Sequence, residues 1–282
     1  MPCLEGVTMN FAIGSILPYL AFAVFLCGTV LRIADWFAKP VPFQLTLFPA
    51  PRGKLGGAAA VLREFVFCNT LFRENRLLWV WVWSFHLSLV MIIAGHVLGI
   101  YFLRSQFSLF GAAPGTSAVL SVTLGATMGT VMTVSLIALL CRRIFIPETR
   151  KLSEPLAWFD LMLLLAVALS GLAMYLPGYH ADLVAVRTFM KGLLTLHPEK
   201  LPTNPVFVIH FSLVIFLVLY FPFSQLIHSA GFFINRAMLA EAAPVFPTPA
   251  GKGPRSPFAG IKHEPGKVSA REDHAAGEVR HQ

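Results

Sequence analysis

The sequence predicts an all-α integral membrane protein with five transmembrane helices, and three observations support this fold class. Of the 282 residues, 56% are hydrophobic and only 13% are charged, and the mean hydropathy is +0.69. Such a composition does not fit a soluble globular domain. Five apolar stretches are each long enough to approach or exceed the roughly 20 residues that a helix needs to cross a bilayer. They lie at residues 12–33, 78–103, 118–141, 156–176 and 206–234, within one membrane domain that covers residues 1–235.

Basic residues between the stretches predict the orientation of the chain, because loops rich in Lys and Arg stay on the cytoplasmic side. Residues 34–77 contain six Lys or Arg, whereas the second loop contains only Arg104. We therefore expect the N-terminus outside and the C-terminus in the cytoplasm. The polar tail, residues 236–282, is expected to be cytoplasmic and disordered on its own. The net charge of +8 is then spread along the inner membrane surface, so nucleic-acid binding is not expected.

The first stretch follows a start without a basic leader or a cleavage site, and we expect it to remain as a membrane helix. After a loop rich in Pro and Gly, residues 62–74 place apolar side chains at helical spacing among charged ones. This pattern predicts an interfacial helix that lies on the inner membrane surface or touches a cytoplasmic partner. Its apolar residues are Leu62, Phe65, Val66, Leu71 and Phe72. Before the fifth stretch, a second interfacial helix is predicted outside, with Leu183, Val186, Met190 and Leu193 on one face.

The second and fifth stretches each carry two histidines, His86 with His96 and His210 with His228. A polar side chain in a lipid-embedded helix is costly and usually has a partner inside the bundle. One such histidine would predict a hydrogen bond between helices, whereas two on each of two helices predict ligands. On ideal helices, the eighteen-residue spacing is five whole turns and about 27 Å, while the ten-residue spacing spans about 15 Å and falls about 80° short of three turns. We expect helix tilt and a bend at Pro222 to absorb this mismatch.

Because the two helices run in opposite directions, His86 is expected at the inner depth of His228, and His96 at the outer depth of His210. A histidine pair on facing helices can ligate a haem iron from both sides. We therefore predict two haems b between the second and fifth helices. A zinc or di-iron site would require converging ligands three or four residues apart, or nearby carboxylates. The sequence also lacks a CxxCH motif for covalent haem attachment.

Gly95, next to His96, has two equally weighted interpretations. It either lets a macrocycle approach the helix backbone or serves ordinary helix packing. A protein of another class, a proton-coupled transporter that relays protons through histidines without haem, is an alternative. That alternative favours intramembrane carboxylates, of which Asp160 is the only one of interest. A further alternative is an anchor that binds haem without reacting with quinol.

The five stretches and the ten- and eighteen-residue histidine spacings resemble the gamma subunit, a membrane cytochrome b, of respiratory nitrate reductases. The resemblance runs from SILPYLAFAVFLCGTVLRI to PFSQLIHSAGFFIN. It implies that the four histidines hold two b-type haems, that the subunit oxidises a membrane quinol, and that Gly95 belongs to the outer haem and quinol pocket. Family members carry a basic residue near the start of the third span. Here only Arg104 is near, and it is assigned to quinol or to a haem propionate.

The long first loop, with PVPF and LFRENRLLW, and the phrase YFPFSQLIH are closer to a sister branch. That branch is the cytochrome b of sulfite-reduction-associated membrane complexes of prokaryotes, whose partner is a cytoplasmic iron-sulfur subunit similar to heterodisulfide reductase. The resemblance implies the quinol-reactive electron-transfer subunit of an oxidoreductase complex, without catalytic residues of its own. It would sit in a prokaryotic cytoplasmic membrane and exchange electrons between menaquinol or menaquinone and that partner, alongside further membrane or periplasmic redox subunits. The gamma subunit of a true nitrate reductase is the alternative.

Overall fold

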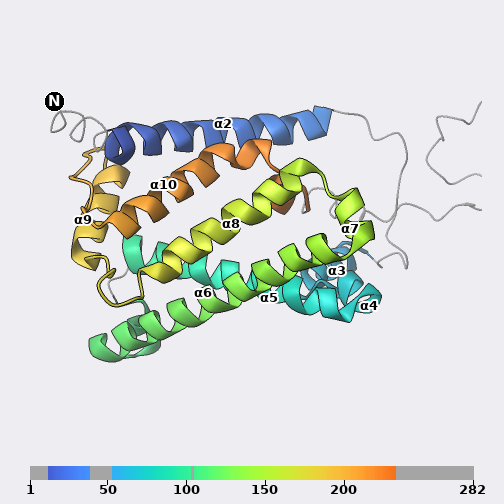
Figure 1. Cartoon of the computed structure of the whole chain (residues 1–282), viewed down its shortest axis with the longest axis horizontal. Coiled ribbons are helices and arrows are strands. Elements are labelled where there is room, and N and C mark those ends of the chain that lie inside the picture. Colours follow the sequence, from blue (N-terminus) through green and yellow to red (C-terminus); the bar gives the residue numbers. More distant parts are fainter. Residues whose placement is uncertain (1–11, 39–52, 103–104, 233–282) are drawn as a thin grey trace, which may run out of the picture.

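The computed structural model describes residues 12–38, 53–102 and 105–232, and every regular secondary-structure element in this part of the chain is a helix (Figure 1). Five helices are long and apolar enough to cross a membrane, which confirms the five predicted spans. The third is longer than predicted at both ends. The five are Ala12–Ala38, Arg76–Ile100, Pro114–Phe145, Pro155–Ala173 and Pro205–Phe223.

The spans form one bundle with a defined order of neighbours. Helix α5 (Arg76–His96) packs along α6 (Pro114–Phe145), α6 along α8 (Pro155–Ala173), α8 along α10 (Pro205–Tyr220), and α10 along α2 (Leu17–Ala38). Figure 1 shows α2, α10, α8 and α6 in this order, with the fainter α5 behind them. The histidine-bearing helices α5 and α10 are therefore not the most closely packed neighbours in the bundle.

Capping residues define where the histidine-bearing helices begin. The side chain of Asn75 accepts a hydrogen bond from the Leu78 N–H at 2.9 Å at the start of α5. Asn204 does the same for the Phe207 N–H at 3.0 Å at the start of α10, with Pro205 as the first helical residue. These contacts satisfy amides that have no partner within the first helical turn.

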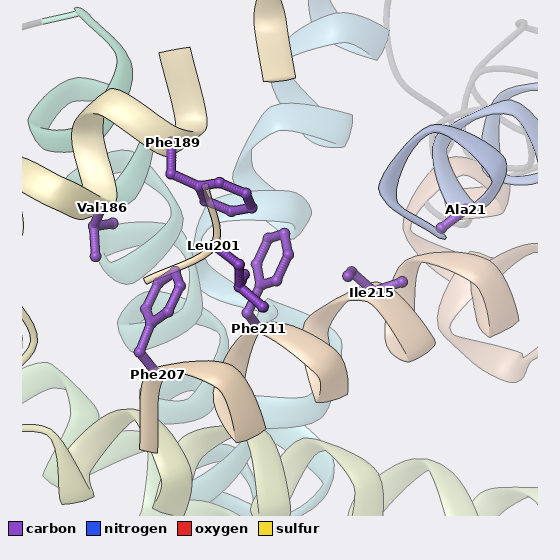
Figure 2. Close-up of a cluster of buried hydrophobic side chains, with 7 residues drawn as sticks. All are labelled: Ala21, Val186, Phe189, Leu201, Phe207, Phe211 and Ile215. Atoms are coloured by element: carbon purple, nitrogen blue, oxygen red, sulfur yellow. The ribbon is translucent and has the colours of Figure 1, made fainter. Parts of the chain in front are cut away.

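One end of the bundle is covered by α9 (Leu183–Leu194), the second predicted interfacial helix. Its Val186 and Phe189 are buried, and Phe189 contacts the rings of Phe207 and Phe211 of α10 (Figure 2). Met190 and Leu193 pack against the same cluster, as predicted. Leu183 does not belong to this face, because its side chain is 54% exposed.

At the opposite end, the predicted interfacial segment forms two helices instead of one. Helix α3 (Gly53–Phe67) and helix α4 (Asn69–Glu74) are separated at Cys68, which has a left-handed φ of 47°. The indole N–H groups of Trp79 and Trp83 donate to the carbonyls of Phe67 and Val66, at 2.7 and 2.9 Å. These bonds satisfy carbonyls at the end of α3 that no helical amide reaches. The short α7 (Pro147–Leu152) lies at this end too.

The fifth predicted stretch is not a continuous helix. After Tyr220 the chain forms a 3₁₀ turn at Phe221–Phe223, an extended residue at Ser224 and a second 3₁₀ turn at Gln225–Ile227. The helix resumes at His228. Proline removes a backbone donor at Pro222, so the predicted bend is a full interruption. Short irregular helices also follow α5, at Val97–Phe102 and Gln106–Phe110, and Ala12–Ile16 precedes α2.

Candidate functional site

The structure brings the four intramembrane histidines together as two pairs. The ring centroids of His86 and His228 are 6.2 Å apart, and the ring planes are nearly perpendicular at 81°. The ring centroids of His96 and His210 are 6.4 Å apart, with an interplanar angle of 32°. Each pair takes one histidine from α5 and one from the α10 segment. The two pairs are those expected from helix direction.

Both α5 histidines are oriented by their own helix. The Nδ1 atom of His86 lies 2.8 Å from the carbonyl oxygen of Val82, and that of His96 lies 2.8 Å from the carbonyl oxygen of Ile92. A carbonyl can only accept a hydrogen bond, so each Nδ1 carries the proton and donates it. The Nε2 atom of each ring is then left with a free lone pair, which is the form of imidazole that binds a metal.

The histidines of the α10 segment are oriented differently. His210 Nδ1 lies 3.0 Å from the Ser170 hydroxyl of α8, and this hydroxyl donates to the Val167 carbonyl at 2.9 Å. The serine oxygen therefore accepts from the histidine ring. His228 Nδ1 donates to the Gln225 carbonyl at 2.9 Å. All four rings thus have an acceptor at Nδ1, and among the described residues none has a hydrogen bond at Nε2.

The spacing within each pair fits two imidazoles that bind one metal ion from opposite sides. A metal–imidazole bond of about 2.0 Å, plus roughly 1.1 Å from nitrogen to ring centre, places two such rings about 6.2 Å apart. The observed 6.2 and 6.4 Å match this value. Among the described residues no three His, Cys, Asp or Glu side chains converge on one point. Two axial ligands per site are what a haem iron takes from a protein, since the macrocycle supplies the other four.

The surroundings of the His96/His210 pair combine glycine and arginine. A Cβ atom on Gly95 would meet nothing within 4 Å, so the absence of a side chain there does not serve packing against the described residues. The α5 helix continues into the π-helical segment Val97–Phe102, a local geometry that is frequent at functional sites. Arg187 of α9 donates from Nε to the carbonyl of Gly99 in this segment at 3.0 Å. Arg104 lies outside the described residues.

The surroundings of the His86/His228 pair contain a buried carboxylate. Asp160 of α8 is only 4% exposed, and its Oδ2 accepts from the backbone N–H of Gln225 at 3.2 Å. The Gln225 side chain donates to Glu154 at 3.0 Å. Two cavities of about 730 and 650 Å³ share Gln225 and Glu154 in their walls. Arg142 and Arg143 line the larger one, whereas Arg32 and His228 line the smaller one.

Sequence reasoning missed Ser170, Gly171 and Gln225. The signal for the first two was a Ser-Gly dipeptide within the fourth apolar stretch. A Cβ atom at Gly171 would lie 3.2 Å from Cε1 of His210, so glycine allows the ring to approach α8 closely. Gln225 was visible only as the one amide side chain within PFSQLIH.

The fold and the site define a multi-pass membrane protein in which two helices bring four histidines into two facing pairs. The chain belongs to the nitrate reductase gamma subunit family, whose sequence model matches residues 68–240. The matched segment contains all four paired histidines and helices α5, α6, α8 and α10.

Individual relatives are similar over most of the chain. A protein of Archaeoglobus fulgidus, named Hdr-like menaquinol oxidoreductase cytochrome b-like subunit, is 30% identical over 259 residues, which cover 79% of this chain and 77% of that protein. Its counterpart in Archaeoglobus profundus is 28% identical and covers 76% and 74%. The nitrate reductase gamma chain of Bacillus subtilis is 27% identical over 153 residues, or 51% of this chain and 68% of that protein.

Proposed function

We propose that this chain is a dihaem b-type cytochrome subunit of a membrane redox complex. The observation that carries the proposal is the pair of facing imidazoles, found twice, each with Nδ1 hydrogen-bonded and Nε2 free. His86 and His228 would hold one haem, and His96 and His210 the other. Haem, when bound, supplies reversible one-electron transfer. The names of the Archaeoglobus relatives, which include cytochrome b-like, support the same assignment.

The residues of the chain hold and orient the two haems at different depths. His86 and His96 lie ten residues apart on one continuous helix, which separates them by about 15 Å along its axis. With the loop charges setting orientation, the His96/His210 site lies near the outer face and the His86/His228 site near the cytoplasm. Between the two sites, electrons would cross about half of the roughly 30 Å hydrocarbon core of a prokaryotic cytoplasmic membrane.

The outer site is where we place the reaction with menaquinol or menaquinone. The side-chain-free surface at Gly95 leaves room for a planar ring beside His96, and Arg104 follows one helical segment later. On the cytoplasmic side we place a partner iron-sulfur subunit similar to heterodisulfide reductase. The name Hdr-like menaquinol oxidoreductase, carried by relatives at 30% and 28% identity, supports this choice over a true nitrate reductase subunit.

A second candidate function rests on Asp160. A carboxylate that is 4% exposed within a membrane span is a marker of proton pathways. A transporter would use Asp160 and the histidines as proton carriers and would bind no haem.

Haem content decides between these functions. We expect two haems b per purified chain, measured by pyridine haemochrome and dithionite-reduced spectra. His86→Ala and His228→Ala should lose one haem, and His96→Ala and His210→Ala the other. His180→Ala is the control, because His180 lies outside the helices and its ring donates to the Met174 carbonyl rather than facing one of the four paired histidines. A folded protein without haem would refute the cytochrome and favour the transporter.

Reduction by a menaquinol analogue then tests the redox role. We expect the wild-type haems to become reduced on its addition, and Gly95→Leu to slow this step without removing haem. An anchor that holds haem without quinol chemistry would show no quinol-dependent reduction.

A further inference from the structure

The two histidine-bearing helices differ in how their ligands are held. On α5 both Nδ1 atoms bond to the carbonyl four residues earlier, so their orientation is internal to the helix. On the α10 segment neither histidine has this partner. His210 bonds to Ser170 of α8, and His228 bonds to Gln225, whose own N–H is held by Asp160 of α8.

The contact at His210 is direct and close. The Ser170 hydroxyl accepts from the ring because its own proton is given to the Val167 carbonyl, and this carbonyl of α8 also lies within hydrogen-bonding range of the ring. Gly171 is the adjacent residue, and even a methyl group there would sit 3.2 Å from Cε1 of the ring. The ring is thus held by a polar contact from one residue and by the backbone surface of the next.

The contact at His228 passes through the interruption of the helix. Asp160 Oδ2 accepts the Gln225 N–H at 3.2 Å, and the carbonyl of the same residue accepts from His228 at 2.9 Å. Within the described part of the chain, no well-aligned hydrogen bond reaches the other carboxylate oxygen or the hydroxyl of Tyr220, but the Tyr220 hydroxyl interacts with the same carboxylate. An intramembrane carboxylate is costly. Its contact with the Gln225 backbone is a physical reason for its presence here.

We propose that α8, which carries none of the four histidines, positions both ligands of the α10 segment. Ser170 is the positioning residue for His210, and Asp160, through Gln225, is the positioning residue for His228. The two residues lie ten apart on α8, the same spacing as His86 and His96 on α5. This inference rests on the proposed haem function and adds residues to it that touch neither iron nor quinol.

The chemistry predicts separate effects on the two haems. An acceptor at Nδ1 fixes the ring orientation and raises the basicity of the ligating nitrogen. Removing the Ser170 hydroxyl from His210 Nδ1 should raise the midpoint potential of the outer haem, because a less basic ligand stabilises the ferric iron less. The inner haem should be unaffected. Variants at Asp160 should change the inner haem and leave the outer haem unaffected.

The test is a redox titration with electron paramagnetic resonance of the full-length protein. Each signal is first assigned by its loss in the histidine variants. Ser170→Ala should raise the midpoint potential of the outer haem and change the position of its paramagnetic resonance signal. Ser170→Thr keeps the hydroxyl, so its potential and signal should match the wild-type values. Ser135→Ala is the control, since Ser135 is a buried serine of another span, α6. If Ser170→Ala does not accumulate, Gly171→Ala tests the same site, because its added methyl group would displace the His210 ring.

The inner site has its own pair of variants. Asp160→Asn keeps an oxygen that can accept the Gln225 N–H, so the inner signal should keep its wild-type position even if the lost charge shifts the potential. Asp160→Ala removes the acceptor and should displace or broaden that signal. Glu154→Gln, at the exposed contact to the Gln225 side chain, should leave it unchanged.

Failure of the inference is distinguishable from failure of the haem proposal. If the wild type binds no haem, the proposed function is wrong. If it binds two haems, but Ser170→Ala and Asp160→Ala leave both potentials and both signals at wild-type values, the α8 inference is overturned. It is also overturned if either variant changes both haems equally.

Discussion

The contact between Gly28 and Pro222 yields the sharpest stability prediction. A Cβ atom added at Gly28 of α2 would lie 2.7 Å from Cβ and 2.9 Å from Cγ of Pro222. Ordinary carbon contacts begin near 3.4 Å, so α2 and the interrupted segment must separate by about 0.7 Å. Neither atom belongs to a flexible chain end, because the proline ring is rigid. Overpacking of this kind costs roughly 1–3 kcal/mol.

Gly28→Ala should therefore lower the melting temperature of the detergent-solubilised protein by several degrees, at roughly 3 °C per kcal/mol for a chain of this size. Because Pro222 belongs to the segment that ends at His228, this loss of stability should be accompanied by reduced haem occupancy at the proposed His86/His228 site. Gly115→Ala in α6 is the matched control, since its Cβ would meet nothing within 4 Å. If Gly28→Ala has the same melting temperature as Gly115→Ala and the same haem content as the wild type, the proposed packing between α2 and Pro222 is wrong.

Three further predictions follow from individual contacts. Trp83→Phe removes the indole hydrogen bond to the Val66 carbonyl and should destabilise α3 by about 1 kcal/mol. The measurement is amide hydrogen exchange across Gly53–Phe67, which should become faster in Trp83→Phe but not in the control Trp158→Phe, a substitution in α8. Burial and the nearby Glu64 raise the pKa of the Cys68 thiol, so its alkylation should reach half-maximal rate at a higher pH than a free cysteine, and Glu64→Gln should lower that pH. Asn204→Ala removes the cap of α10 and two hydrogen bonds to the Tyr179 and His180 carbonyls. In thermal melts it should lower the stability of the protein by at least about 1 kcal/mol. Asn69→Ala, which removes one exposed contact, should lower the stability by less.

The sequence was sufficient for the spans and for the pairing of the histidines by depth. Both follow from composition, apolar length and helix direction, which are properties of single segments. The exposed position of Leu183 on α9 and the break between α3 and α4 at Cys68 could not be predicted from the sequence. A left-handed residue in an otherwise helical pattern leaves no signal in periodicity. The indoles of Trp79 and Trp83, which donate to the carbonyls at this break, come from the following span, α5.

Contacts from a third helix were beyond sequence reasoning. Ser170 and Gly171 lie in an apolar stretch with no titratable group nearby, and their relevance depends on how α8 rotates against α10. Asp160 could be recognised as unusual, because a carboxylate in a span is rare. Its partner could not, because the Gln225 N–H becomes available only where the helix is interrupted.

The same interruption resolves the unequal spacing of the histidines. On straight helices, ten residues of α5 rise about 15 Å, whereas eighteen residues would rise about 27 Å, and two pairs with equal ring separations could not form. The continuous part of α10 after His210 ends at Tyr220, ten residues later, so it rises by the same 15 Å as α5. The chain from Tyr220 to His228 must then move sideways more than along the axis. Asp160 interacts with Tyr220 at the start of this segment and accepts from Gln225 three residues before His228, so it contacts the segment at two points. The ten-residue register, not the eighteen-residue one, is what aligns the two pairs.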